Sequence, residues 1–546
     1  LLENLRILTD GIVAGRTARL AADRAFARLE KGAPPGALPA PLPSAFVAQL
    51  RQRMREFDPR LSALATAVDE ALAANGTTPE DAVREENQRQ ATDQVSTANT
   101  ITSLRFSSTL DWSVFVEQVS RTEEILRRDP AGIYPRMDFA SRDRYRHAVE
   151  DLAGRSRKAD AGEAQNRIAL RAIESARRAA ELGGIGEKSA HVGHHLIGPG
   201  RRDLEADVAF RPSPGNRLRR FCLAHATALY LGSIGLLTGL GVAAAYAYAG
   251  LAAAGLAGGM AACAALLALV PASELAVLVV QRLVAALVAP LRLPRLDFRH
   301  GIPENARTLV VVPVLIGSLD EVDRLLAHLE VQALGNLDPQ IHFALLSDFK
   351  DAATATVPGD EAILSAAISG IEELNRRHRA AGNDRFFLLH RERKWNPQEG
   401  VFMAWERKRG KIEELNRRLR SAEDSGFTVE IGDLAILPSV RFVLTLDADT
   451  RLPRDAAREL IGILAHPLHR PVVDKESRKV TAGYGILQPR VSVNLASAAG
   501  SLFARIYAGH TGVDPYTTAV SDTYQDLFGA GIFTGKGLYD VDAFEA

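Results

Sequence analysis

The feature that most limits the fold of this chain is a long stretch without charged side chains. Residues 221–273 contain no Asp, Glu, Lys or Arg. A buried helix of a water-soluble protein rarely needs so long an uncharged segment, whereas two membrane crossings of about 20 residues each fit it well. We therefore predict a transmembrane helical hairpin over residues 221–272. An alanine-rich hairpin in a soluble protein is the alternative.

Arginines flank this stretch on both sides. They are Arg217, Arg219, Arg220, Arg282, Arg292, Arg295 and Arg299. The positive-inside rule places both flanks in the cytoplasm. Residues 273–288 combine polar Glu274 and Gln281 with an apolar face and are predicted to lie along the membrane surface, so 273–299 is assigned to an interfacial helix and linker.

The overall composition excludes several classes of protein. The 66 basic and 66 acidic residues leave no net charge to attract nucleic acid, so we expect no such partner. Cys222 and Cys263 both lie in apolar sequence and offer neither a disulfide framework nor metal-ligand spacing. Residue 1 is Leu within a helical pattern, so we expect a piece of a longer chain.

Two regions flank the apolar stretch. Residues 1–220 carry apolar residues at helical spacing, interrupted by a Pro/Ala/Gly connector at 32–44, and predict an α-helical region on the cytoplasmic side. In residues 300–546, strand patterns alternate with helical patterns, which predicts an α/β domain with a mostly parallel sheet. Such sheets bind ligands beyond the carboxyl ends of their strands.

Acidic residues follow two of the predicted strands. Asp348 ends one strand, and Asp447 and Asp449 follow another in the stretch "VRFVLTLDADTRLP". A carboxylate pair at a strand end can share Mg²⁺ or Mn²⁺ with a diphosphate. A phosphatase of the haloacid-dehalogenase type would need Thr at position 451, which is Arg, and a calcium loop would need a glycine that "DADTRLPRD" lacks. A solvated turn is the remaining alternative.

Basic and glycine-rich segments accompany these acids. "WERKRGKIEELN" (405–416) places Arg407 and Lys408 at a turn before a helix, which suits an anionic diphosphate but also a solvated helix start. "ILQPRV" brings Gln488 and Arg490, whose donors suit sugar hydroxyls or phosphate. The histidines of "HVGHH" (191–195) are interpreted as a structural turn, since no carboxylate or cysteine partner is evident.

Several blocks together resemble the glycosyltransferase domain of the cyclic β-1,2-glucan synthases, glycosyltransferase family 84. In the last part of the chain they are "LLSDFKDA", "LHRERKWNPQEG", "AWERKRGKIEELN", "TLDADTRLP", "HPLHRP", "GYGILQPRV", "GVDPYTTAVSDTYQDLFG" and "GKGLYDVDAFE". Upstream, "ANTITSLRFSSTLDW", "DPAGIYPRMDFASRDRYRHAVEDLA" and "HVGHHLIGPGR" resemble the region before the membrane spans of the same proteins. The similarity covers most of residues 80–546.

The resemblance implies a multi-pass enzyme of the bacterial inner membrane. Its cytoplasmic domain would have a family-2-like (GT-A) fold, use UDP-glucose, and extend a β-1,2-glucan linked to the protein itself, with phosphorylase-like domains following in the full-length chain. Asp348, Arg407, Lys408 and Asp447 would then bind the donor nucleotide, with Asp348 at the uridine and Lys408 and its neighbours at the diphosphate. Asp447 and Asp449 would hold Mg²⁺ or Mn²⁺. The sugar and acceptor side would be lined by Gln488, Arg490, Gly535 and Lys536.

Two departures from the family pattern qualify this assignment. Ala530 stands where an acid is expected, and the general base of the family, an Asp, is expected beyond Ala546. The catalytic residue is therefore unknown within this sequence. The alternatives are another membrane polysaccharide synthase, cellulose- or hyaluronan-like, or a catalytically inactive scaffold with a transferase fold.

Overall fold

The computed structural model describes residues 2–546 except 32, 35–37, 55–61, 75, 155–160, 253–257, 289–290, 380–382, 423–424, 490–499, 508–526, 530–532 and 534. The chain divides into two compact units, Leu1–Val119 and Ser120–Ala546. The region predicted as one helical segment, 1–220, is thus shared between two units. The second unit contains its later helices together with the sheet.

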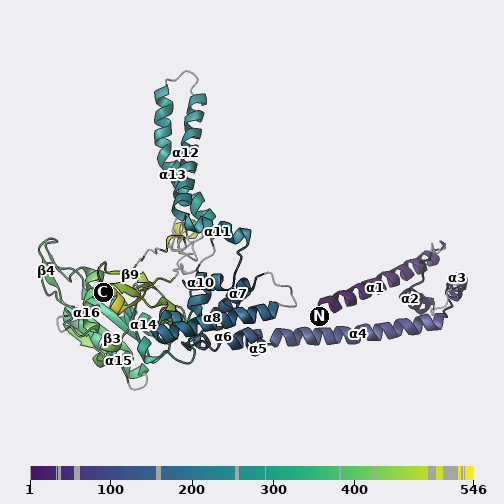
Figure 1. Ribbon diagram of the computed structural model, residues 1–546, viewed down its shortest axis with the longest axis horizontal. Coiled ribbons are helices and arrows are strands. Elements are labelled where there is room, and N and C mark those ends of the chain that lie inside the picture. The colour runs from purple at the N-terminus through teal and green to yellow at the C-terminus, as the bar shows by residue number, and fades with distance from the viewer. Residues whose placement is uncertain are drawn as a thin grey trace. The chain divides into compact units, whose positions relative to one another are not determined.

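The first unit consists of helices whose apolar sides meet in a small core (Figure 1). They are α1 (Leu2–Glu30), α2 (Ser44–Met54), α3 (Ser62–Ala73) and α4 (Pro79–Thr109), and they are followed by α5 (Trp112–Val119), none of whose residues is buried. α4 begins where the Thr78 side chain accepts the Asp81 N–H at 3.2 Å, with Pro79 in the first turn. Phe46 and Leu50 of α2 are buried in the shared core.

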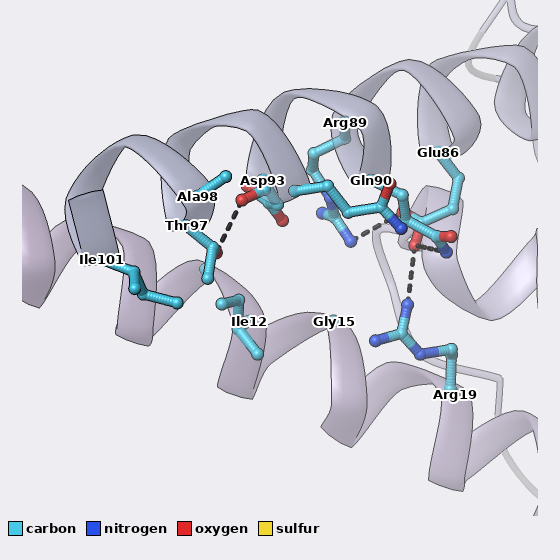
Figure 2. A pocket seen from close by; sticks show the side chains of 12 residues that line it. Ile12, Gly15, Arg19, Glu86, Arg89, Gln90, Asp93, Thr97, Ala98 and Ile101 are labelled. Atoms are coloured by element: carbon cyan, nitrogen blue, oxygen red, sulfur yellow. Dashed lines mark hydrogen bonds and ion pairs between the residues drawn. The ribbon is translucent and has the colours of Figure 1, made fainter.

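A groove of about 610 Å³ runs between α1 and α4 (Figure 2). The buried carboxylate of Glu86 lies there, 3.0 Å from Arg19 Nη1 and 2.7 Å from Arg89 Nη2. Gly15 leaves room for Arg89, because a Cβ at this position would lie 2.9 Å from Arg89 Nη2. The groove holds an ion-pair cluster that joins two helices, and no predicted site residue lines it.

The second unit opens with helices packed around Tyr134 and Tyr145. They are α6 (Arg121–Leu126), η2 (Tyr134–Arg136), α7 (Phe139–Ala153), α8 (Ala161–Gly183), η3 (Lys188–Ala190), α9 (Val192–Leu196) and α10 (Arg201–Asp207). His191 is fully buried, with Nδ1 2.8 Å from Asp129 Oδ2 and Nε2 3.0 Å from Tyr145 OH. Both ring nitrogens are engaged within the protein, which favours the structural interpretation of this histidine.

The apolar stretch forms two long helices that lie side by side (Figure 1). After α11 (Pro214–Ala224) come α12 (Ala226–Ala252) and α13 (Gly258–Leu287), and Gly241 of α12 faces Ala272 of α13. Both helices are long and apolar enough to cross a membrane, by length and composition. α13 continues through Pro271 to Leu287, so the predicted division between a spanning segment and a surface helix at 272 is not a break in the helix.

An α/β arrangement follows from residue 304 onward. Its elements are η4 (Glu304–Ala306), β1 (Thr308–Ile316), α14 (Leu319–Gly335), β2 (Ile341–Phe349), α15 (Asp360–His378), β3 (Phe386–Arg391), β4 (Lys394–Asn396), β5 (Val401–Met403), α16 (Arg407–Leu419), β6 (Val429–Ile431), η5 (Leu434–Ser439), β7 (Phe442–Thr445), α17 (Ala456–Leu464), η6 (Pro467–His469), β8 (Val472–Asp474), β9 (Lys479–Ala482), β10 (Ile486–Leu487), α19 (Leu502–Tyr507), β11 (Gly537–Asp540) and α22 (Val541–Glu545).

The main sheet has the strand order β10-β11-β7-β1-β2-β3-β6. The four strands β7, β1, β2 and β3 are parallel, while β11, β10 and β6 pair antiparallel at the edges. Helices α14, α15 and α17 contribute to the core on one face, and α16 and η5 to the core on the other. The predicted mostly parallel sheet is confirmed. Its parallel strands all end at the same edge.

The linker that follows α13 (residues 291–303) contacts both the early helices of this unit and the sheet layer. Arg295 Nε lies 2.7 Å from Asp138 Oδ2, and its Nη1 lies 2.9 Å from Glu459 Oε2. The N–H of Leu296 donates to the carbonyl of Gly462 at 3.0 Å. A Cβ on Gly462 would lie 2.5 Å from the Leu296 carbonyl oxygen. The linker therefore crosses α17 where that helix has no side chain.

The variant Gly462→Ala should lower the free energy of unfolding of the second unit. The added methyl meets backbone, which cannot rotate away, and overpacking of this kind costs about 1–3 kcal/mol. Denaturant unfolding of the detergent-solubilised protein measures the change. Gly162→Ala in α8 is the matched control, because a Cβ there meets nothing within 4 Å. Equal stability of the two variants would contradict the close crossing.

Candidate functional site

The predicted acids lie at one edge of the sheet. Asp348 is the penultimate residue of β2 and pairs with Leu315 of β1, while Thr445, the last residue of β7, pairs with Val311. β1 lies between β2 and β7, and all three run parallel. Asp348 and the Asp447 turn therefore lie at the same edge of the sheet, at the carboxyl ends of two strands that have β1 between them.

Asp348 is buried among cations. Arg391 of β3 donates from Nε to Oδ1 at 2.9 Å and from Nη2 to Oδ2 at 3.0 Å, and Lys411 Nζ lies 3.0 Å from Oδ2. Lys411 also donates to the carbonyls of Val314 at 2.5 Å and Leu346 at 3.3 Å. Burial lowers the pKa of Lys411 to about 8 despite the neighbouring Asp348 carboxylate. Both Asp348 oxygens are occupied within the protein, so its predicted contact with uridine stays a prediction.

Arg391 connects this acid to the turn before α16. Its Nη1 donates to the Trp405 carbonyl at 3.1 Å and to Glu414 Oε2 at 3.0 Å, and its Nη2 donates to the Arg407 carbonyl at 3.2 Å. Burial would lower the pKa of Arg391, but hydrogen bonds and charge from Asp348 and Glu414 outweigh it and raise the pKa. One guanidinium thus ties a strand, a helix and a turn together.

The turn itself is strained. Glu406 and Arg407 have φ of 51° and 45°, in the left-handed region that non-glycine residues enter at a cost of roughly 1–2 kcal/mol each. Gly410 permits the close approach of α16, because a Cβ there would lie 2.1 Å from the Trp405 carbonyl oxygen. The hydrogen bonds from Arg391 fall on the residues around this turn and hold it in place.

Asp447 lies between two lysines. Lys408 Nζ is 2.5 Å from Oδ1 and Lys536 Nζ is 3.0 Å from Oδ2, and Lys408 also donates to the Gly535 carbonyl at 3.0 Å. Burial would raise the pKa of Asp447, but the hydrogen bonds from the two lysines outweigh this effect, so the pKa is lowered overall. Gly535 has φ of 84°, which suits glycine. Asp447 is therefore ionised and paired.

The other predicted residues are placed less centrally. Asp449 is exposed, and among the described residues no hydrogen bond or ion pair involves its carboxylate. Arg407 turns to Asp351, with Nη2 2.7 Å from Oδ2, rather than to Asp447. Gln488 lies half-buried just after β10, beside Gly537 of β11. Arg490, like Ala530, falls outside the described residues.

The structure gathers Lys408, Asp447, Gly535 and Lys536 in one place. The sequence assigned the first two to the diphosphate and the last two to the sugar side, whereas here Lys536 contacts the same carboxylate as Lys408. Sequence reasoning missed Arg391 and Lys411 as partners of Asp348. "FFLLHR" does end in Arg391, so the rule that strand-end residues meet at one sheet edge applied to it as well.

The donor chemistry at Asp447 and Asp449 fits a hard divalent cation only in part. Carboxylate oxygens are suitable ligands, but within the described ranges no group of three or more His, Cys, Asp or Glu side chains could hold a metal. The ammonium groups of Lys408 and Lys536 neutralise the charge of the Asp447 carboxylate. A cation at this carboxylate would replace their charge and leave Lys408 and Lys536 free to meet an anion.

Comparison with known proteins finds a relative that matches most of this chain. No protein-family model matches the chain. The chain is 40% identical over 502 residues to a protein of Rhizobium meliloti (strain 1021) described as cyclic beta-(1,2)-glucan synthase NdvB. The match covers 92% of this chain but only 17% of the relative. The chain therefore spans a small part of the length of the curated relative it matches.

Replacing Arg391 with Lys should destabilise the second unit although the charge is kept. A lysine cannot reproduce the fork that bonds Asp348, the turn carbonyls and Glu414 together, and the loss of several buried hydrogen bonds costs about 2–4 kcal/mol. Denaturant unfolding measures this. Arg418→Lys, which alters a half-buried bidentate pair with Glu430, is the control and should cost under about 1 kcal/mol. Similar losses for both variants would contradict a special role for Arg391.

Proposed function

Because this chain is homologous over 502 residues to a segment of the cyclic β-(1,2)-glucan synthases, we propose that its sheet layer is the glucosyltransferase part of such an enzyme. The layer would be a GT-A-type domain that binds UDP-glucose and adds glucose to a growing β-1,2-glucan linked to the protein. The single observation that carries the proposal is the cluster Lys408–Asp447–Lys536 at the carboxyl edge of the parallel strands.

The charges of the cluster suit a nucleoside diphosphate. Lys408 and Lys536 supply two cations on one small surface, and charge-assisted bonds to phosphate are stronger than neutral ones. We propose that Asp447 and Asp449 share Mg²⁺ or Mn²⁺ with that diphosphate, and that the bound metal would stabilise charge on the departing UDP. Asp447 would exchange its two lysines for the cation, and the lysines would then contact the phosphates.

The chemistry on the acceptor side is a further part of the proposal. An inverting, processive transfer needs a general base for the acceptor hydroxyl. Asp540 is already occupied, since it pairs with Arg441 at 3.2 Å and accepts the Ala543 N–H at 3.3 Å. As the resemblance implies, we place the base C-terminal to residue 546. A cellulose- or hyaluronan-like synthase would share the donor cluster and differ in the linkage of its product.

The membrane arrangement completes the proposal. We propose that α12 and α13 cross the bacterial inner membrane, and that further spans and the phosphorylase-like domains belong to the full-length enzyme. Two apolar helices that pack together support this arrangement. Nucleotide sugars are cytoplasmic, so the sheet layer and the helices before α12 would both face the cytoplasm.

UDP should bind more tightly when Mg²⁺ or Mn²⁺ is present, and Asp449→Asn should remove most of this effect. A neutral amide cannot offset the charge of the cation, so the loss of affinity should be at least about tenfold, or roughly 1.4 kcal/mol. Isothermal titration calorimetry with and without metal tests this. Glu372→Gln on the exposed side of α15 is the control. UDP affinity that does not respond to metal in the unaltered protein would contradict the metal proposal.

A reporter fused at residue 300 should read as cytoplasmic in bacterial cells. The expected result follows from an even number of crossings between residues 220 and 300 together with the flanking arginines. Paired alkaline phosphatase and fluorescent-protein fusions give the measurement, and a fusion at residue 255, in the connection between α12 and α13, is the matched control that should read as periplasmic. The opposite pattern would overturn the orientation.

A further inference from the structure

The helix that precedes the two apolar helices has an unusual surface. α11 (Pro214–Ala224) begins where Ser213 accepts the Asn216 N–H at 3.3 Å, and none of its residues is buried. Leu218 and Phe221 are 64% and 58% exposed. An exposed Phe and Leu on a helix of this length are costly in water, because apolar area left exposed forfeits about 25 cal/mol per Å².

The exposed side chains of α11 are ordered around the helix. Residues three and four apart share a helix face, so Leu218, Phe221 and Cys222 form one apolar face. Arg217 and Arg219 flank this face, one on each side, at about 100° from Leu218. Both arginines are exposed, and neither forms an ion pair with another described residue. An apolar centre between two free cations is the pattern of a helix lying in a membrane interface.

The opposite side of α11 is fixed to the protein. Arg220 makes a bidentate pair with Glu205 of α10, with Nη1 2.8 Å from Oε2 and Nη2 2.7 Å from Oε1. This pair sets the rotation of the helix and directs the apolar face away from α10. The ion pair between Arg220 and Glu205 therefore orients the apolar face away from the protein.

The position of α11 in the chain indicates what covers this face. Only the turn residue His225 separates α11 from α12, the first of the two apolar helices (Figure 1). We propose that α11 lies in the headgroup layer of the membrane, with Leu218 and Phe221 among the acyl chains and Arg217 and Arg219 bound to anionic headgroups. The inference rests on the proposed membrane crossing of α12. It places an interfacial helix before the spans, whereas the assignment of 273–288 to the membrane surface stays a prediction.

Cys222 offers a reporter on the same face. The chain has two cysteines, so Cys263→Ala leaves Cys222 as the one thiol for an environment-sensitive fluorophore. The full chain is reconstituted in zwitterionic vesicles and in vesicles containing phosphatidylglycerol. Lipids with a nitroxide near the headgroup or near the chain end serve as quenchers. We expect quenching by the shallow nitroxide, stronger in the anionic vesicles.

The arginines are tested by Arg217→Gln combined with Arg219→Gln. Each basic residue near an anionic surface contributes about 1 kcal/mol, so the ratio of inserted to free label should fall roughly 30-fold in anionic vesicles and change little in zwitterionic ones. The matched control is Arg24→Gln with Arg28→Gln, two exposed arginines of α1 in the first unit. This control should leave the quenching unchanged.

The outcomes separate the two proposals. Resistance of the protein to alkaline extraction from the vesicles tests the spanning helices independently of the label. Membrane retention with a fully water-exposed label would overturn the α11 proposal alone. A label that is shielded from water but not quenched by either nitroxide lipid would show a protein partner on this face, and would overturn it as well. Quenching equal in both lipids and insensitive to the double variant would overturn the role of the arginines.

Discussion

The ion pair between Asp348 and Arg391 is the contact on which the candidate site depends. A buried charge pair of this kind adds little net stability, because removing both charges from water costs about as much as their attraction returns. Its value here is geometric. The Arg391 fork bonds one strand-end acid, the carbonyls on both sides of a left-handed turn, and Glu414 of α16. Lys408 follows that turn directly and reaches Asp447, which lies just after β7. The position of the lysine is thus set from β2 and β3.

Much of this architecture is visible in the sequence. Apolar runs such as "TLVVVPVLI" and "IHFALLSDF" coincide with β1 and β2, because strands buried on both faces need uninterrupted apolar residues. The strand-end acids follow from that assignment. Arg391, which ends a neighbouring strand, could have been found by the same rule, whereas Lys411 reaches Asp348 from a helix that packs on the sheet, and no local pattern encodes that contact.

The division of the helices at Val119 is likewise not visible in the sequence. The helices before residue 220 look alike in sequence, yet the contacts divide them at Val119, because those after it pack with the linker and the sheet layer. His191 lies where these helices contact the sheet layer. Its ring lies 5.3 Å from that of His466, which lies 5.2 Å from that of His469. Burial lowers the pKa of His466, and that of His469 to about 4, so these two rings meet as neutral groups at neutral pH.

The position of β1 between β2 and β7 fixes the distance between the ends of these two strands. Hydrogen-bonded strands are spaced by about 4.8 Å, so the acid at the end of β2 and the acid after β7 stand roughly two spacings, or about 10 Å, apart along the sheet. Side-chain substitutions cannot alter that interval, because it is measured in backbone hydrogen bonds. A ligand that reached both acids would have to span this interval. Variation in the surrounding loops can change which chemical group lies at the end of β2 or of β7, while the distance between the two strand ends stays constant.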